Sequence, residues 1–298
     1  MKFGLIITER GKRPVFPWKD KLVDVLDFAE RQGISVPAAD AEKFIKTEGT
    51  VPFLRRLWDI LEEPDEDLLY EKEKVKFLPP VPSPEKIICL GRNYIDHCQE
   101  QGKEPPENPV IFAKYRNALI GHRGKIILPR SSRMVDYEAE LVVVIGKGGK
   151  GIEPAEAYKH ILGYAVGNDV SARDCQFGDG QWVRGKTFDT FLPLGPFITT
   201  ADQVEDPHSL HIKLDLNGKP MQDSSTSKMV FPVDYIISFI SKDITLSPGD
   251  IICTGTPAGV GFFRKPQVFL KEGDQIRIEI ERVGVLENFV VLPEVPSV

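Results

Sequence analysis

The stretch DYEAELVVVIG, residues 136–146, indicates both a fold class and a candidate site. Glu138 and Glu140 stand directly before an apolar run whose length and β-branched content predict a buried strand. Because side chains alternate along a strand, the two carboxylates share one face, about 6.5 Å apart along the chain. Burying two like charges is costly unless a cation compensates them. A solvated strand end with two surface glutamates is the alternative that this motif alone leaves open.

Short apolar runs of the same kind, separated by turn signals, continue on both sides of this stretch and predict one β-rich domain over residues 85–298. The pair Asn217-Gly218 predicts a two-residue hairpin turn, because both residues tolerate positive φ. One helix is expected over residues 234–241. The runs are KIICLG (86–91), PVIFAK (109–114), KIILP (125–129), ELVVVIG (140–146), GYAVGND (163–169), HIKLDLNG (211–218), DIICTG (250–255) and QIRIEIE (275–281).

Residues 1–75 have a different pattern and predict a small α/β N-terminal domain. A short strand is expected over Phe3 to Thr8, and apolar residues at helical spacing predict two or three helices. The positions with this spacing are Leu22, Val23, Leu26 and Ala29, then Phe53, Leu57, Trp58, Ile60 and Leu61. Residues 76–84 carry four prolines, which favour extended structure, and we interpret them as a linker. The predicted fold class is α+β, predominantly β.

The composition excludes several classes of protein. The 298 residues carry a net charge of -6 without a long basic stripe, so nucleic acid is not an expected partner. The apolar runs are far shorter than the roughly 18–20 residues of a membrane span, and no membrane partner is expected. The first residues lack the features of a signal peptide and the four cysteines are widely spaced. We therefore expect a cytoplasmic protein with reduced thiols.

A second carboxylate motif lies in GYAVGNDVSARDCQ, residues 163–176. It predicts a strand that ends at Asp169, then a turn or short helix carrying Arg173 and Gln176. If this strand end lies beside the two glutamates, Asp169 becomes a third oxygen ligand. An all-carboxylate set suits Mg²⁺ or Mn²⁺, which keep positions open for water and substrate. A capped turn without a ligand role is the alternative.

Two further charged motifs have a functional interpretation if they lie beside such a site. Three carboxylates and one divalent ion leave one net negative charge, which a nearby Lys186 would neutralise. His97 and Glu100 are spaced i, i+3 on a helix predicted to begin at the N-cap Asn93, so the glutamate can orient the imidazole as a general base. The alternatives are a solvated lysine and an exposed amphipathic helix.

A glycine-rich turn, TGTPAGVG, is expected at residues 254–261 after a strand. It lacks the G-K-[ST] ending of a phosphate-binding loop, so we exclude a nucleotide site. Its glycines would let backbone amides approach a small anion, with the Thr256 hydroxyl as an added donor. A purely structural turn remains the alternative.

In chain order these motifs resemble those of the fumarylacetoacetate hydrolase superfamily. The matching motifs are G-R-N-Y-x-D-H-x-x-E from residue 91, E-x-E-L from 138, D-x-S-A-R-D-x-Q from 169, G-K-x-F-D from 185 and G-T-P-x-G-V-G from 255. The resemblance covers residues 85–298 and is specific because the whole ordered set is present. The runs GKTFDTFLPLGP and TGTPAGVGFFRKPQVFLKEGD are most similar to the branch of fumarylacetoacetate hydrolase domain-containing protein 2 and its bacterial relatives.

The resemblance implies a mixed β-roll catalytic domain that usually forms a homodimer and binds Mg²⁺ or Mn²⁺ through Glu138, Glu140 and Asp169. It also implies that Lys186 and Gln176 contact substrate, and that Arg92 and Arg173 bind substrate or support its contacts. Thr256 is implied to bind the substrate carboxylate. His97 and Glu100 are implied to form a dyad that closes over the site. The parent hydrolases take an extra aspartate ligand and their catalytic histidine from a differently built segment. Fumarylacetoacetate itself is therefore not the expected substrate.

The expected substrate is a small 2-oxo acid whose enolate Lys186 helps to stabilise. Hydrolysis of a C–C bond in an acylpyruvate-like substrate is our first hypothesis, with His97 and Glu100 deprotonating the attacking water. Oxaloacetate decarboxylation or keto-enol tautomerisation is the second, and isomerisation of a hydroxylated dienedioate the third. A non-catalytic metal-binding protein is the last alternative, and the sequence gives no role for the N-terminal domain.

Overall fold

The computed structural model describes residues 1–38, 43–47 and 49–294, and sheet dominates it. The largest sheet in this part of the chain runs in the order β4-β3-β2-β1-β15-β12-β11-β18-β6-β7, with β5 beside β1. Its strands are β1 (Lys2–Thr8), β2 (Gly11–Trp18), β3 (Lys21–Asp24), β4 (Leu69–Glu71), β5 (Lys76–Leu78), β6 (Ile87–Gly91), β7 (Val110–Ala113), β11 (Ala139–Ile145), β12 (Ile161–Asn168), β15 (Phe197–Thr200) and β18 (Ile251–Cys253).

A second sheet has the order β17-β16-β19-β20-β9, and two short strand pairs, β10 with β13 and β14 with β8, complete the described strands. The bounds are β8 (Leu119–Ile120), β9 (Lys125–Ile127), β10 (Val135–Asp136), β13 (Ser171–Ala172), β14 (Leu192–Pro193), β16 (His211–Leu216), β17 (Lys219–Ser225), β19 (Gln275–Ile280) and β20 (Gly284–Val291). The turn between β16 and β17 has φ values of 53° at Asn217 and 76° at Gly218, which confirms the predicted hairpin.

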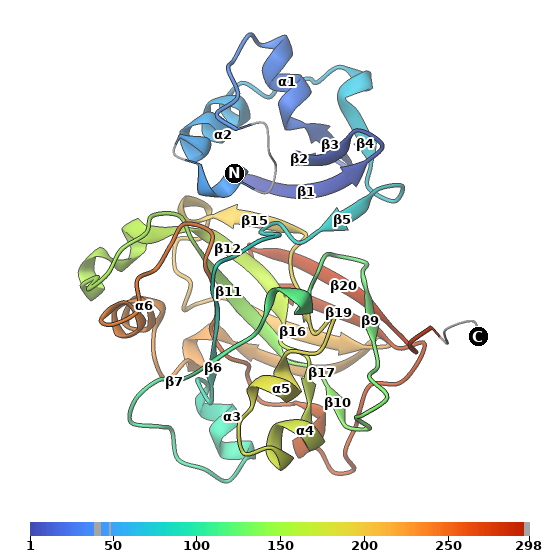
Figure 1. Ribbon diagram of the computed structural model, residues 1–298, viewed down its shortest axis with the longest axis vertical. Coiled ribbons are helices and arrows are strands. Elements are labelled where there is room, and N and C mark those ends of the chain that lie inside the picture. Colours follow the sequence, from blue (N-terminus) through green and yellow to red (C-terminus); the bar gives the residue numbers. More distant parts are fainter. Residues whose placement is uncertain (39–42, 48, 295–298) are drawn as a thin grey trace.

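The described helices lie outside these sheets, and none is long and apolar enough to cross a membrane. They are α1 (Val25–Arg31), α2 (Thr50–Asp59), α3 (Ile95–Glu100), α4 (Arg173–Gly178), α5 (Val183–Lys186) and α6 (Val233–Ser241), with 3₁₀ turns at Phe44–Lys46, Glu66–Leu68, Arg116–Ala118, Pro154–His160, Ala201–Gln203, Thr226–Lys228 and Gly261–Phe263. The helix expected over residues 234–241 is confirmed as α6. Figure 1 shows α1 and α2 at one end of the molecule and α3, α4 and α5 at the other.

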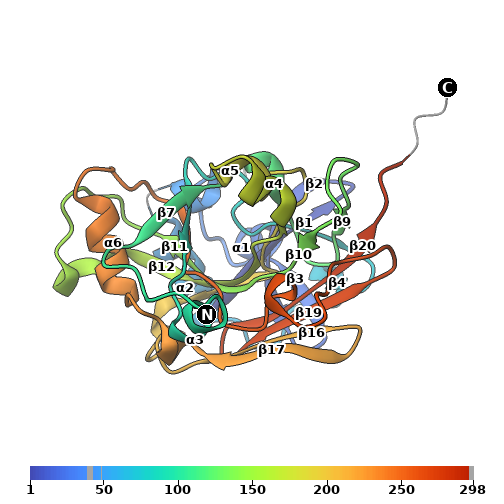
Figure 2. The same cartoon turned by 90° about the horizontal axis from the view of Figure 1, so that it is seen from below.

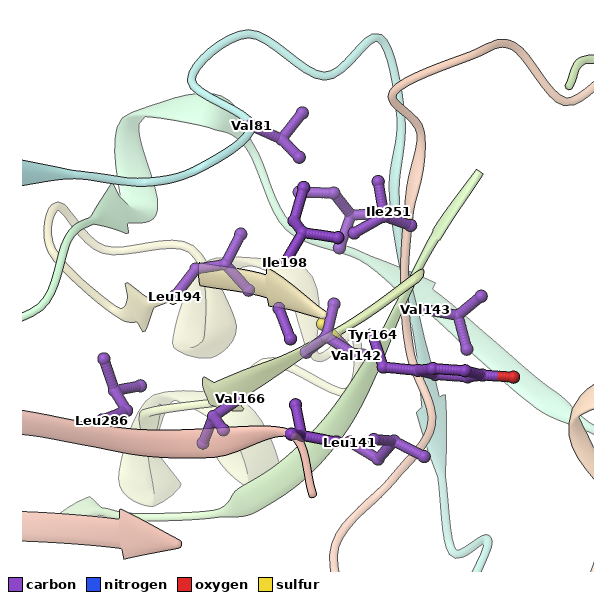
Figure 3. Packing of buried hydrophobic residues seen from close by; sticks show 14 of the residues in the cluster. Val81, Leu141, Val142, Val143, Tyr164, Val166, Leu194, Ile198, Ile251 and Leu286 are labelled. Carbon is purple, nitrogen blue, oxygen red and sulfur yellow. The ribbon is translucent and has the colours of Figure 1, made fainter. Parts of the chain in front are cut away.

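The core lies between the two sheets, and Figure 2 shows the β16, β17 and β19 layer beneath β11 and β12. Every residue of β11 and β12 is buried, which explains their nearly continuous apolar sequence. Figure 3 shows Val166 between Leu141 of β11 and Leu286 of the second sheet. Each such buried side chain stabilises the fold by about 1.5–3 kcal/mol. This rigid strand pair carries the candidate site at its end.

The N-terminal residues differ from the prediction in two respects. Leu22 and Val23, predicted to be helical, form β3, and the helix begins only at Val25 because Asp24 caps it by accepting hydrogen bonds from the backbone amides of the second and third helical residues. Residues 11–18, for which no element was predicted, form β2. Helical spacing was misleading here because a strand that is buried on both faces can also carry adjacent apolar residues.

The predicted linker also begins with a strand. Residues 76–78 precede the first proline, keep their backbone donors, and pair with β1 as β5. On its other edge β1 pairs with β15, so one sheet runs from the N-terminal residues into the rest of the molecule. The division into residues 1–75, 76–84 and 85–298 stays a prediction.

Candidate active site

The three predicted metal ligands lie together at one end of the β11–β12 pair. Ala139 pairs with Asn168, and this register sets the glutamates of the E-x-E motif beside the residue that follows β12. One ligand oxygen each from Glu138, Glu140 and Asp169 lies within 4.8 Å of the others, and all three side chains are buried. The alternative of a solvated strand end is therefore wrong for this motif.

Two buried lysines hold the Asp169 carboxylate. The Lys186 Nζ atom, as predicted, lies close to the cluster, 2.7 Å from Asp169 Oδ2 and 2.6 Å from Glu138 Oε2. The Lys114 Nζ atom donates to Asp169 Oδ1 at 2.5 Å and to the Val170 carbonyl at 3.0 Å. The sequence analysis missed Lys114, although a lysine ending the apolar run PVIFAK was a signal for a buried charge.

Arg173 is fixed on the other side of Glu138. Its Nη2 atom lies 2.7 Å from Glu138 Oε1, and its Nε atom donates to Asp136 Oδ2 at 2.9 Å. Its Nη1 atom donates to Gln176 Oε1 at 3.0 Å, so α4 delivers both predicted residues to the cluster. Asp136, whose role the sequence did not reveal, also accepts hydrogen bonds from the Gly261 and Phe262 amides.

The charges of this cluster are unevenly compensated. Burial opposes ionisation of Glu138, but the Lys186 and Arg173 charges more than offset it and hold the Glu138 pKa well below its usual range. Burial raises the Glu140 pKa well above its usual range, and the Asp169 and Glu138 charges raise it further. Four buried carboxylates, with Asp136 included, face three buried cations. A cation beside Glu140 would offset this excess of one negative charge.

The residues present fit a divalent metal. The Glu140 Oε2 atom accepts a hydrogen bond from the Gly255 amide at 2.9 Å, whereas its buried Oε1 atom has no hydrogen-bond partner in the described part of the chain. A buried carboxylate oxygen without a partner is costly, and metal ligation would satisfy it. Three carboxylate oxygens and no sulfur or imidazole are the donors that hard divalent ions prefer.

A cavity lined in part by Glu138 opens beside this cluster. All but three of the predicted site residues line it, the exceptions being Glu140, Asp169 and Glu100. Aromatic side chains form much of the remaining surface. The lining residues are Leu90, Gly91, Arg92, His97, Gln101, Phe112, Glu138, Arg173, Gln176, Phe177, Trp182, Lys186, Thr256 and Phe263.

The predicted histidine–glutamate pair forms on α3. The His97 Nδ1 atom lies 2.6 Å from Glu100 Oε1, and the second Glu100 oxygen accepts from the Gly259 amide at 2.9 Å. With Glu100 as acceptor, Nδ1 carries the imidazole proton and the lone pair is on Nε2. The Gln101 amide, which the sequence analysis did not single out, lies 2.7 Å from that nitrogen.

Asn93 acts differently from the prediction, and the Thr256 hydroxyl is already engaged within the protein. Asn93 does not cap α3; its amide donates to the Phe231 and Thr254 carbonyls and ties the loop before α3 to the glycine-rich turn. The Thr256 hydroxyl donates to the Ala139 carbonyl at 2.9 Å, so its proton is not directed at an anion. It accepts from the Gln222 amide at 2.8 Å. Partners as distant in sequence as β17 could not be foreseen from the turn itself.

Comparison with known proteins identifies the family. Residues 86–291 match the model of the fumarylacetoacetate (FAA) hydrolase C-terminal family. The chain is 53% identical over 222 residues to oxaloacetate tautomerase FAHD2A, mitochondrial, of Bos taurus, covering 74% of this chain and 71% of that protein. The solved fumarylacetoacetate hydrolase (EaFAH) of Exiguobacterium antarcticum has a TM-score of 0.82 at 32% identity, over 98% of this chain and 100% of that one. A 5-carboxymethyl-2-hydroxymuconate delta-isomerase from Mycobacterium smegmatis has a TM-score of 0.75 at 33% identity, over 99% and 100%.

The chain therefore belongs to the fumarylacetoacetate hydrolase family. This confirms the predicted family and the predominantly β fold class. Enzymes of the family generally use a divalent metal, in agreement with the buried acidic cluster of this chain. The names of the similar proteins include a tautomerase, a hydrolase and an isomerase, so family membership leaves the reaction open.

Proposed function

We propose that this protein is a Mg²⁺- or Mn²⁺-dependent enzyme that enolises a 2-oxo acid, and that its reaction is the keto-enol tautomerisation of oxaloacetate. The observation that carries the proposal is the buried cluster of Glu138, Glu140 and Asp169, which opens onto a cavity beside Lys186. The identity of 53% to a protein named oxaloacetate tautomerase supports oxaloacetate over other 2-oxo acids. This order reverses the first two hypotheses drawn from the sequence.

Tautomerisation makes few demands on the site. A C3–H bond of the keto acid breaks, an O–H bond forms at the 2-oxo oxygen, and the composition of the substrate is unchanged. When bound, a divalent ion supplies the Lewis acidity that stabilises negative charge on that oxygen. The reaction needs no attacking water and no leaving group.

Lys186 is suited to hold the developing negative charge. Although burial lowers the Lys186 pKa, the Asp169 and Glu138 charges outweigh it and raise the pKa above its ordinary value. The side chain therefore stays an ammonium group at neutral pH and can donate its third hydrogen bond to the 2-oxo oxygen. Arg173 and Gln176, held together at 3.0 Å, form the adjoining wall of the cavity and orient the substrate.

His97 is suited to move the C3 proton. Glu100 and the Gly259 amide fix the ring so that its Nε2 lone pair is available. The Gln101 amide lies 2.7 Å from this atom, so Gln101 must turn aside before the substrate reaches it. The Gln101 amide thereby shields His97 Nε2 from water until the substrate C–H group takes its place.

Hydrolysis of a C–C bond in an acylpyruvate-like substrate is the second candidate. The His97–Glu100 pair favours it, because the same Nε2 atom can accept a proton from water, and the similar structure named fumarylacetoacetate hydrolase supports it. Oxaloacetate decarboxylation and dienedioate isomerisation proceed through the same enolate and are the remaining, lower-ranked candidates. A non-catalytic role leaves the histidine–glutamate pair and the open cavity without purpose.

One assay separates these reactions. The full chain, loaded with Mn²⁺ or Mg²⁺, is given the enol form of oxaloacetate, and its ultraviolet absorbance and the release of carbon dioxide are followed. Cleavage of acetylpyruvate is measured in parallel. We expect fast loss of the enol, no carbon dioxide above background, weak or no cleavage, and loss of all activity in EDTA. Cleavage that is faster than tautomerisation would reverse the order of the two candidates.

The assembly and the compartment belong to the same proposal. A homodimer in the cytoplasm is the expectation from the sequence, and residues 1–75 are proposed to extend the dimer or to cover the mouth of the cavity. The name of the bovine relative places that protein in mitochondria. Light scattering of the purified chain tests the dimer directly.

A further inference from the structure

Arg92 is a cation in the cavity that the described structure leaves without a carboxylate partner. It lines the cavity at the end of β6, and its Nε atom is buried without a hydrogen-bond partner among the described residues. The other two basic side chains lining the cavity are compensated by protein carboxylates: Lys186 by Glu138 and Asp169, and Arg173 by Asp136 and Glu138. The Arg92 side chain is half-buried, and its buried nitrogen without a partner favours a ligand that supplies an acceptor.

The backbone of Arg92 is held in an unusual conformation. Its φ is 55°, in the left-handed region that side chains other than glycine rarely adopt. The neighbours enforce this geometry: the Asn93 side chain is hydrogen-bonded on both its nitrogen and its oxygen, and the Trp182 ring packs so closely on Gly91 that a Cβ there would lie 2.5 Å from it. These contacts fix the backbone from which the Arg92 side chain reaches the cavity wall.

The expected ligand follows from the charge of the cluster around Glu140. Its four carboxylates and three basic side chains, together with one divalent ion, carry one net positive charge, which the C1 carboxylate of a 2-oxo acid would neutralise. The charge of Arg92 lies outside this balance and is available for a second anionic group. The aromatic wall, with Phe112 and Trp182 in edge contact at 5.6 Å, offers no other partner for such a group.

We infer that Arg92 binds the distal carboxylate of the substrate and thereby selects 2-oxo dicarboxylates over neutral acylpyruvates. This inference rests on the proposed function, because it presupposes that the 2-oxo acid end occupies the metal cluster. The planar guanidinium group can donate two parallel hydrogen bonds to a carboxylate, and a buried bond of this kind discriminates strongly against a ligand that lacks the charge. Acetylpyruvate, which ends in a neutral acetyl group, lacks this contact.

The test compares two ligands in four forms of the Mn²⁺-loaded full chain: wild type, Arg92→Gln, Arg92→Lys and Arg282→Gln. Oxaloacetate carries the distal carboxylate, whereas oxalate has only the two adjoining carboxylate groups expected to chelate the metal and no distal one. Dissociation constants come from fluorescence titration, because Trp182 lines the cavity, and KM and kcat come from the tautomerase assay. Arg282 is the matched control, since it is an exposed arginine with a similar φ of 62°.

We expect Arg92→Gln to weaken oxaloacetate binding and raise its KM by about 10- to 100-fold, the range for a lost charged hydrogen bond. Oxalate affinity should change less than about twofold, which also shows that the variant is folded. Arg92→Lys should recover part of the loss, and Arg282→Gln should match wild type. Equal weakening of both ligands, or no weakening of either, would overturn the inference.

The two proposals can fail separately. If wild type binds oxaloacetate without tautomerising it, and Arg92→Gln still weakens only oxaloacetate, the proposed reaction is wrong and the role of Arg92 stands. If wild type tautomerises oxaloacetate and Arg92→Gln leaves its KM unchanged, the reaction stands and the role of Arg92 is wrong. If wild type binds oxalate but not oxaloacetate, both are wrong.

Discussion

Lys114 Nζ lies 2.5 Å from Asp169 Oδ1, and neither side chain is exposed to solvent. Lys186 Nζ lies 2.7 Å from the other oxygen of the same carboxylate. Asp169 is therefore held between two ammonium groups, and its remaining lone pairs have fixed directions. Of the three candidate ligands it is oriented by lysines alone, whereas Glu140 is oriented by a backbone amide.

Replacing Lys114 by methionine removes one of these two ammonium groups and leaves the packing volume nearly unchanged. Breaking one side of a buried ion pair destabilises a protein by about 3–5 kcal/mol, because the remaining charge is left uncompensated. We expect this loss in EDTA and a smaller loss in Mn²⁺, since a bound cation takes over part of the compensation. Urea unfolding under both conditions measures the difference.

The matched control for this change is Lys103→Met, which alters an exposed lysine outside the site. It should shift neither unfolding curve by more than about 0.5 kcal/mol. A Lys114→Met loss that is the same in EDTA and in Mn²⁺ would show that Lys114 serves packing and not the charge balance of the site.

Replacing Glu140 by glutamine tests the metal cluster itself. Since burial and two neighbouring carboxylates raise the Glu140 pKa, a neutral amide relieves an unfavourable charge in the metal-free protein. We expect metal-free stability equal to or above that of wild type, together with a fall in Mn²⁺ affinity on the order of 100-fold. Titration calorimetry gives the affinity, with the exposed Glu153→Gln as control. Unchanged Mn²⁺ affinity would place the metal elsewhere.

Replacing Glu100 by glutamine tests His97 as the base. The amide can offer His97 Nδ1 a hydrogen atom instead of accepting one, which favours the tautomer with its proton on Nε2. We expect kcat for tautomerisation to fall by about 100-fold, with oxalate affinity and Mn²⁺ affinity unchanged. If kcat stays at the wild-type value, the C3 proton is moved by another group.

The sequence was sufficient to predict those features whose geometry is local. Alternation along one strand placed Glu138 and Glu140 on one face, and the strand ending at Asn168 delivered Asp169 to the same end of the sheet. The Asn217-Gly218 turn was equally local. These features depend on the regular geometry of the backbone and hardly on the side chains that pack against them.

The partners of these residues could not be inferred in the same way. Lys114 reaches Asp169 across 55 sequence positions, and Gln222 reaches Thr256 across 34, because the fold brings segments distant in sequence together. The strand Lys21–Asp24 was mistaken for helix because it is buried on both faces and so does not show the alternation expected of a strand. Side-chain hydrogen bonds between strands depend on a register that no single stretch of sequence encodes.

His122 allows a test of stability far from the metal cluster. Its ring packs edge-on against Phe77 with centroids 5.2 Å apart, and its Nδ1 atom accepts a hydrogen bond from the Glu287 amide at 3.1 Å. Burial, assisted by the charge of Arg123, lowers the His122 pKa from 6.5 to about 4. Between these two pH values the unfolded chain binds more protons at this residue than the folded chain does, so stability rises with pH across the window.

His122→Asn keeps an acceptor for the Glu287 amide and removes the titration. In EDTA, lowering the pH from 7 to 4 should therefore cost wild type about 3 kcal/mol more free energy of unfolding than it costs the variant. Urea unfolding at closely spaced pH values measures this difference, and parallel pH profiles for the two proteins would show that His122 is protonated equally in both states.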